Sequence, residues 1–404
     1  MKCKKTNAQN RNGSALALVM LGVVLLVIIG LSIIDLSTHS SVFAVRSAID
    51  IKARTAADAA VADAVFQMNE KLKVRPWTDD SFPAASNVEL LNSNATYDYA
   101  VSKIDDVYTV VGTGHAINKT RVVNGALDLR SAFDFAVFAR DFIELKSKTL
   151  ITWYNNKSTD WPLQVGVGSI NAGAITLRSD STIKGDVLVG ATGDPDVVIG
   201  GSKGATITGD AYPMMFNPIL PSITPPAVLA AASSLGDIKN TTTISSSGKY
   251  KTINLGNSEV ITIDEPVTLY ITDDITFGNS ARIIIGGPTD TDNDASLTIY
   301  LTGNMNGDNG AGFNNLTTDA KRLAIYCMDS CKKVTLKNGS DFRGTLYAPE
   351  AAIIMDNSGD IYGSIIGSSY IQRNSGVIYY DASLRKRTVN DEGVRFVINR
   401  WSEP

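Results

Sequence analysis

The sequence predicts an α+β module built on a long N-terminal helix, followed by an all-β region made of a repeat. Residues 15–34 are apolar and carry no charge, which predicts a helix of membrane-spanning length. Apolar and polar residues alternate in short segments over 95–130, which predicts antiparallel strands. Related units begin at Asn338, Asn357 and Asn374, and such a repeat of short strands indicates a solenoid.

The apolar run has basic flanks on its N-terminal side only. As a helix, residues 15–34 span about 30 Å, the thickness of a bilayer core. The residues before it are basic and none is acidic, so the N-terminus is expected in the cytoplasm and the bulk of the chain outside. Three interpretations stay open: a cleaved secretory signal, a permanent signal anchor, and a prepilin. The run is longer than the apolar core of a usual signal peptide.

The residues Gly13-Ser14-Ala15-Leu16, placed after a basic leader, resemble the start of type IV prepilins, above all minor pilins of the PilX N-terminal type. The resemblance implies that a prepilin peptidase cuts between Gly13 and Ser14. It also implies that the helix lies first in the bacterial inner membrane and later among other pilins or pseudopilins. The helix residues taken to serve membrane insertion and assembly are Leu18, Leu25, Ile29 and Ile34.

One residue departs from the pattern of major pilins. In that family the fifth residue after the cut is Glu, and the matching residue here is Leu18. The Glu of major pilins is thought to neutralise the N-terminal amine of a neighbouring subunit, and an unpaired charge in lipid is costly. The departure therefore implies a minor or tip subunit rather than the repeating body of a filament.

The first module is expected to end near residue 130. With 1–13 as the leader, apolar residues at three- and four-residue steps, many of them Ala, predict one helix over 14–73. Residues 74–94 are predicted to be a loop, because they contain Pro76 and several other turn formers. The small antiparallel sheet over 95–130 would complete a pilin-like α+β module.

Residues 131–385 are predicted to form a β-solenoid. The strands are short, Gly and Asn separate them, and no long amphipathic helix intervenes. Residues 212–226 are rich in proline and are predicted to be a crossing strap, because Pro lacks the amide donor that a central strand needs. The Asn units start 19 and 17 residues apart (338 to 357 to 374), a period of about 20. Residues 386–404 are predicted to be a last strand and tail.

The C-terminal repeat also resembles a known domain. Leu346-Tyr347-Ala348-Pro349, Tyr362-Gly363-Ser364-Ile365 and Tyr379 to Leu384 resemble a β-solenoid domain of uncharacterised function that occurs behind PilX-type N-termini. This resemblance implies a right-handed parallel β-helix and no established catalysis.

The cysteines are candidates for a disulfide. Cys327 and Cys331 lie beyond the apolar run, where an oxidising compartment would allow a bond between them. The alternative is two free thiols. A zinc site is not expected, because the only histidines, His39 and His115, are distant in sequence.

An acidic run is the best candidate for a metal site, and it is a weak one. Asp290, Asp292 and Asp294 have the alternate spacing of a calcium loop. However, Ala295 replaces the expected Gly and Leu301 the expected Glu, so a solvated acidic turn is favoured and no cofactor is predicted.

The remaining candidate surfaces are few. The net charge of −4 and the lack of a large basic patch in the sequence beyond the leader argue against a nucleic-acid partner. The aromatic residues Trp153, Tyr154 and Trp161 could stack on sugars of a surface polysaccharide, or could pin their loop to the solenoid.

The predicted function is therefore structural. We expect a minor or tip pilin-like subunit of a type IV pilus or type II secretion-like filament, with the solenoid displayed in the periplasm or outside the cell. No enzyme activity is expected. The alternatives are a membrane-anchored adhesin or carbohydrate-binding solenoid and, third, a polysaccharide-active enzyme with acidic or basic groups gathered in one groove.

Overall fold

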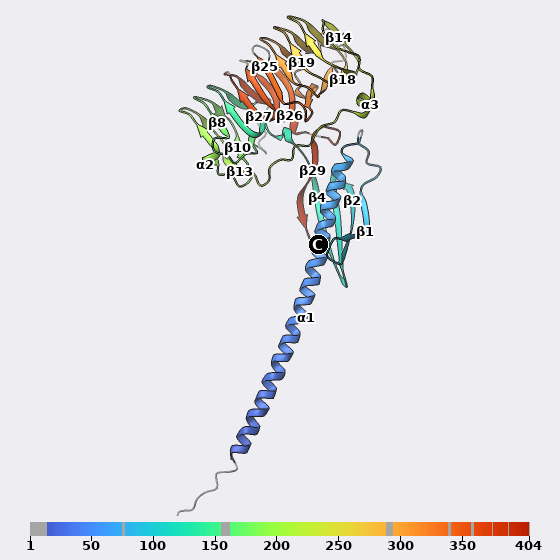
Figure 1. Cartoon of the computed structure of the whole chain (residues 1–404), viewed down its shortest axis with the longest axis vertical. Coiled ribbons are helices and arrows are strands. Elements are labelled where there is room, and N and C mark those ends of the chain that lie inside the picture. Colours follow the sequence, from blue (N-terminus) through green and yellow to red (C-terminus); the bar gives the residue numbers. More distant parts are fainter. Residues whose placement is uncertain are drawn as a thin grey trace, which may run out of the picture. The chain divides into compact units, whose positions relative to one another are not determined.

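The structure is a computed structural model that describes residues 14–74, 77–154, 162–287, 294–337, 341–356, 359–373, 375–386 and 388–403. The chain forms two compact units (Figure 1). Unit 1 is Met1–Asp128 together with Phe396–Pro404, and unit 2 is Leu129–Arg395. The predicted C-terminal segment 386–404 is therefore divided between the two units.

Unit 1 is built on helix α1 (Ser14–Lys71), which is about 87 Å long at 1.5 Å per residue. Its N-terminal half exposes large apolar side chains throughout. Its C-terminal half buries a row of small residues against the sheet of unit 1. This row is Ala53, Ala56, Ala57, Ala60, Val61 and Ala64. One helix therefore has two different surfaces, as the Ala-rich pattern predicted.

The sheet of unit 1 has five strands in the order β1-β2-β3-β4-β29. Their bounds are β1 (Ala84–Leu90), β2 (Ala95–Ile104), β3 (Val107–Ala116), β4 (Lys119–Ser131) and β29 (Val394–Ser402). The pairs from β1 to β4 are antiparallel, which confirms the predicted small antiparallel sheet.

Strand β1 of this sheet was not predicted, whereas β29 falls in the segment 386–404 that was predicted to contain the last strand of the chain. Strand β1 lies within the predicted loop 74–94, where its pairing with β2 shifts register between Ala85 and Val88. Strand β29 comes from the far end of the chain and lies beside β4. Asn69 of α1 holds it in place, because its side chain donates to the Phe396 carbonyl (3.1 Å) and accepts from the Phe396 amide (2.8 Å).

Two glycines of β3 allow α1 to approach the sheet closely. A Cβ on Gly114 would lie 2.0 Å from the carbonyl oxygen of Ala53, and one on Gly112 would lie 2.7 Å from that of Ala57. Because both obstacles are helix backbone, they cannot move aside as a side chain could. The helix and sheet therefore pack at a distance that requires glycine at these positions.

Unit 2 consists of short parallel strands stacked in three rows, which we call rows A, B and C (Figure 1). A rung is one strand of each row, joined in chain order. Row A holds β7 (Gln164–Val167), β10 (Asp186–Val189), β13 (Ala211–Pro213), β15 (Gly248–Tyr250), β18 (Pro266–Ile271), β21 (Ser296–Leu301) and β24 (Leu323–Cys327). Row B holds β8 (Ile175–Leu177), β11 (Ile199–Gly201), β16 (Ile253–Leu255), β19 (Ile275–Phe277), β22 (Met305–Gly307) and β25 (Lys333–Lys337).

Row C consists of two ladders. One holds β14 (Thr242–Ile244), β17 (Val260–Ile263), β20 (Arg282–Ile285) and β23 (Gly312–Asn315). The other holds β6 (Leu150–Trp153), β9 (Thr182–Ile183), β12 (Thr206–Ile207) and β28 (Val377–Tyr380). Strand β5 (Val137–Leu145) runs through rows A and B, and β26 (Phe342–Asp356) and β27 (Ile361–Gln372) run through all three. Short helices complete the unit: η1 (Ala132–Asp134), α2 (Pro195–Val198), α3 (Ala227–Ala231), η2 (Ala320–Arg322) and η3 (Ala382–Arg385).

The core of unit 2 follows from this register. Leu269, Ile299 and Ile325 pair in succession along row A and are almost fully buried. The predicted repeat has the same spacing: Phe342 pairs with Ile361 and Ile361 with Ile378, which are the same 19 and 17 residues apart. The starting residues Asn338, Asn357 and Asn374 lie outside the described residues. The predicted β-rich region with parallel strands is thus confirmed.

The spatial order of the rungs differs from their order in the chain. Row A runs β13-β10-β7-β5-β27-β26-β24-β21-β18-β15, so the first strand of the unit lies beside β27, near the end of the chain's path. The chain must therefore cross from one end of the stack to the other between β13 and β15. Nine steps of about 4.8 Å make about 43 Å, which an extended proline-rich segment at about 3.1 Å per residue spans easily. The predicted strap 212–226 lies in this crossing, although Tyr212 and Pro213 still belong to β13.

We predict that Gly114→Ala destabilises unit 1 by about 1–3 kcal/mol, because the new Cβ overpacks the contact with α1. Hydrogen–deuterium exchange of the full chain should show faster exchange in residues 53–64 and 107–116. The matched control is Gly125→Ala, whose Cβ would meet only a methyl group of Val61 at 3.2 Å. Equal protection in both variants would contradict the close packing.

Candidate functional site

The N-terminal half of α1 is the candidate site, because its large apolar side chains are exposed to solvent in a continuous run. Leu18 is 72% exposed and Ile34 is 64% exposed, and Leu25 and Ile29 are also exposed. The helix is long and apolar enough to cross a membrane, with a mean hydropathy of 3.1 over a window of which none is buried. Gly13 lies outside the described residues, and Ser14 begins the helix.

Two hydroxyl side chains in this half of the helix are hydrogen-bonded to the helix backbone. Ser32 donates to the carbonyl of Ile28 (2.9 Å), and Thr38 donates to that of Ile34 (2.6 Å). Because the helical backbone is paired within the helix, together with these two hydroxyls, the apolar surface around them can enter an apolar environment. Such a surface fits lipid or the apolar helices of other subunits.

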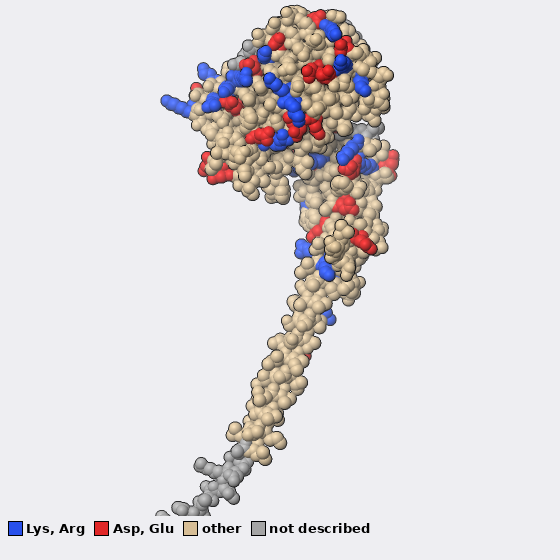
Figure 2. Space-filling model, in the orientation of Figure 1, with Lys and Arg blue, Asp and Glu red and all other residues tan. Residues whose placement is uncertain are grey.

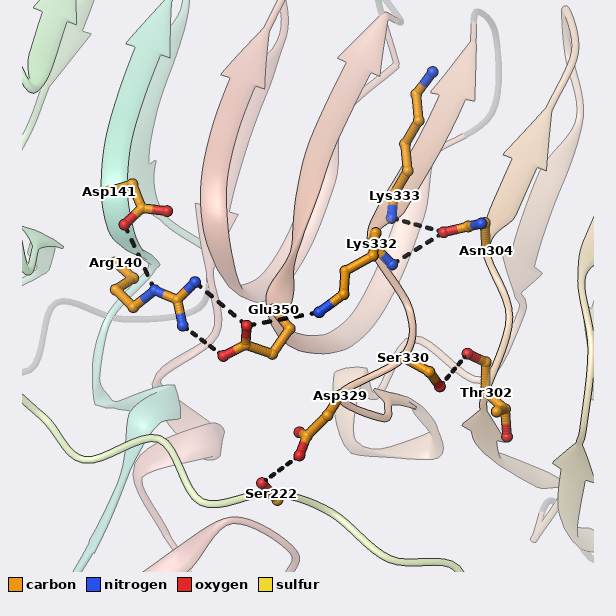
Figure 3. Close-up of polar contacts among 10 residues, drawn as sticks. All are labelled: Arg140, Asp141, Ser222, Thr302, Asn304, Asp329, Ser330, Lys332, Lys333 and Glu350. Atoms are coloured by element: carbon orange, nitrogen blue, oxygen red, sulfur yellow. Dashed lines mark hydrogen bonds and ion pairs between the residues drawn. The ribbon is translucent and has the colours of Figure 1, made fainter.

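The turns between rows A and B carry a row of polar contacts that join different rungs (Figure 3). The guanidinium of Arg140 binds both carboxylate oxygens of Glu350, and Lys332 lies 3.8 Å from the same group. The hydrogen bond from Arg140 lowers the pKa of Glu350, and the charge of Lys332 adds to this effect. These three residues come from three different rungs, so the contacts join strands that are distant in sequence.

Amide and carboxylate side chains at the turns continue the backbone ladder from one rung to the next. The Oδ1 of Asn304 accepts hydrogen bonds from the backbone amides of Lys332 (3.0 Å) and Lys333 (2.9 Å; Figure 3). The backbone amide of Asn304 in turn donates to the Oδ1 of Asp274 (2.7 Å). The same device recurs at other turns. In four more pairs the side chain of the first residue accepts the backbone amide of the second: Asn257 and Asn279, Asp341 and Asp360, Asp360 and Val377, and Asp186 and Asp210. Asp274 is used in this way, whereas its neighbour Asp273 accepts the backbone amide of Asp274 within the same turn.

The proline-rich strap covers an aromatic column on the outer side of row A. Tyr270, Tyr300, Tyr326 and Tyr347 stand in register on successive rungs. Tyr347 is fully buried and donates to the carbonyl of Pro221 (2.8 Å), and burial raises its pKa. Ser222 donates to Asp329 (2.7 Å; Figure 3). The strap thus seals an apolar surface.

Two of the aromatic residues proposed to stack on sugars, Trp153 and Tyr154, pack against aromatic rings of the protein itself. Trp153 packs against Tyr380, with ring centroids 5.4 Å apart. Tyr154 meets the ring of Tyr362 edge-on at 5.0 Å, and Arg343 lies over both rings. These contacts favour the alternative that the rings pin their loop, and Trp161 lies outside the described residues.

The cysteines lie close together in the core. Cys327 ends β24, and Cys331 closes the following turn by donating its amide to Met328 (2.9 Å). Both are buried free thiols, so the disulfide stays a prediction. The hydrogen bond with Cys331 and burial together raise the pKa of Cys327.

The structure does not test the calcium candidate. Asp290 and Asp292 lie outside the described residues, whereas Asp294 lies just before β21. Within the described part of the chain, no group of three or more His, Cys, Asp or Glu side chains could hold a metal ion.

The comparisons with known proteins cover part of the chain. A family model described as a domain of unknown function (DUF7305) matches residues 221–387, within unit 2. A solved structure, the competence-associated pilin ComZ from Thermus thermophilus, is 13% identical and covers 88% of this chain and 97% of its own. Its TM-score is 0.21, too low to carry an argument. A search of curated proteins finds no match.

We predict that Asn304→Ala destabilises unit 2 by about 1–2 kcal/mol, because two backbone amides lose their acceptor. The loss should appear as a lower midpoint of urea-induced unfolding of the full chain. The matched control is Asn306→Ala, which truncates an exposed side chain of the following strand β22 and should leave the midpoint unchanged. A similar midpoint in both variants would mean that the hydrogen bonds from Lys332 and Lys333 to the Asn304 side chain do not stabilise unit 2.

We predict that Cys327 and Cys331 form a disulfide when the chain folds in an oxidising compartment, because both thiols lie within one turn. Alkylation of the denatured protein should label neither cysteine until a reductant is added. Full labelling without reductant, in protein isolated from that compartment, would mean that the thiols stay free.

Proposed function

We propose that this protein is a pilin-like structural subunit that carries a β-solenoid. The observation that supports it most is the division of α1 into two halves. The C-terminal half is packed on an antiparallel sheet, whereas the N-terminal half exposes apolar residues over its whole circumference. Leaving that surface in water costs about 25 cal/mol per Å², so it needs lipid or sister helices.

The proposed path of the helix has two stages. The basic leader and the apolar run place the subunit in the bacterial inner membrane, with its N-terminus in the cytoplasm and units 1 and 2 outside. A prepilin peptidase then cuts between Gly13 and Ser14. The freed helix packs among the helices of other pilins or pseudopilins, where the same apolar surface is buried.

The position in the filament follows from Leu18, which has no charge to pair with a neighbouring N-terminal amine. We therefore assign the subunit a minor or tip position, in a filament of the type IV pilus or type II secretion kind. The resemblance of the first residues supports the PilX N-terminal type.

For unit 2 we propose a parallel β-solenoid, supported by three rows of strands in one register and by one buried column running along row A. Its role would be structural and not catalytic. The acidic pair Asp273 and Asp274 serves a turn, and Glu350 is held by two cations. These carboxylates thus have structural partners.

We predict that the full chain loses residues 1–13 when it is coexpressed with a prepilin peptidase, so that its intact mass corresponds to a start at Ser14. Gly13→Val should block the cut, because a branched side chain would fill the cleavage position. The matched control is Gly22→Val, inside the helix where a Cβ has open space, which should be cut like the wild type. An uncut wild-type chain beside a cut reference prepilin would favour a permanent anchor, and with it the adhesin alternative.

A further inference from the structure

Basic residues of unit 2 gather at the turn that follows row B. At several of these turns the first residue after the row B strand donates its amide to a carbonyl of the neighbouring rung. Arg178 donates to Leu145 (2.8 Å), Lys146 to Gln372 (3.0 Å) and Arg373 to Met355 (2.8 Å). Three successive rungs therefore carry a cation at the same position.

Two more lysines extend this row, and we call the set the basic ridge: Lys146, Lys148, Arg178, Lys203 and Arg373. Lys148 lies in the same turn with a positive φ of 64°, and Lys203 lies in the turn of the next rung outward. Both side chains are exposed and make no ion pair with any described residue. Figure 2 shows blue side chains projecting from the side of unit 2 where β8 lies in Figure 1.

Carboxylates balance only part of the ridge. Glu144 accepts from Lys146 (2.7 Å) and Arg178 (2.9 Å) together. Asp356 lies 3.7 Å from Arg373. Asp180 lies in the same turn as Arg178. The five cations of the ridge therefore face three carboxylates, and the ridge keeps an excess of positive charge although the net charge of the whole chain is −4.

The other half of the stack arranges its charges differently. There Lys337 stands between Asp308 and Asp356 and pairs with Asp308 at 2.9 Å, so the signs alternate. The two rungs beyond have Gly278 and Gly256 at this position. Like charges on facing strands repel each other, so the positive charge of the ridge that Glu144 and Asp356 leave unbalanced favours an external anion.

We propose that the basic ridge binds an anionic polysaccharide that carries a carboxylate on its successive sugars. The rungs are about 4.8 Å apart, close to the length of one sugar in an extended polymer, so successive carboxylates can meet successive rungs. In duplex DNA the phosphates of one strand are spaced about 3.4 Å apart along the helix axis, which does not match the rungs. The described residues of these turns also include no aromatic ring on which a base could stack.

The test uses the full chain in an uncharged detergent and immobilised polygalacturonate as the probe. Binding should weaken as salt is raised, because the contacts are between exposed charges. Lys148→Gln with Lys203→Gln should weaken binding about fivefold, since each exposed ion contact contributes little alone. Neither substitution removes an ion pair between residues that the structure describes, so folding should be unaffected.

The matched control is Lys184→Gln with Lys251→Gln, which makes the same change of net charge outside the ridge. Lys184 lies in the turn after a row C strand, and Lys251 lies in the turn after a row A strand. It should bind like the wild type. Equal binding by the ridge variant and the wild type, equal loss in the control, or equal binding to neutral dextran would each overturn the proposal. Tighter binding of single-stranded DNA, lost in the ridge variant, would assign the ridge to nucleic acid instead. The assay needs neither leader cleavage nor a filament, so its failure is distinguishable from failure of the proposed assembly role.

Discussion

The in-register pairing of parallel strands is the constraint on which unit 2 depends. Each rung alone exposes an apolar strand face, and only stacking removes that face from water. Because Leu269, Ile299 and Ile325 pair directly, residues at equivalent positions in successive rungs become neighbours whatever their distance in sequence. The buried column, the Asn304 ladder and the basic ridge are three results of this single register.

The order of the rungs has its own structural cost. Since β5 lies beside β27 in the interior of the stack, the chain has to build one half, cross the full length, and build the other half inward. A helix or a hydrogen-bonded strand would not serve for this crossing. An extended proline-rich segment suits it, because proline needs no partner for a missing amide and its ring preserves the extended conformation. The strap also buries Tyr347, so the connection contributes to packing.

Much of this fold could be predicted from the sequence because the relevant signals are local. The uncharged run 15–34 and the Ala-rich steps after it specify one helix with two surfaces, since helical periodicity is a short-range property. The alternation over 95–130 indicates strands for the same reason. The spacing of the Asn units reproduces the register of Phe342, Ile361 and Ile378, because each unit is one rung.

Only the tertiary structure decided which distant segments meet. Strand β1 lies in a stretch that local turn formers mark as a loop, and its pairing with β2 overrides them. Strand β29 joins the sheet of unit 1 from the far end of the chain, through Asn69. The basic ridge could not be predicted from the sequence, because its cations are scattered from Lys146 to Arg373 and no short stretch of sequence contains more than two of them. By itself the sequence determined the elements and their apolar faces, which depend on neighbours within a few residues. The structure decided rung order and surface charge, which depend on pairing between residues far apart in the chain.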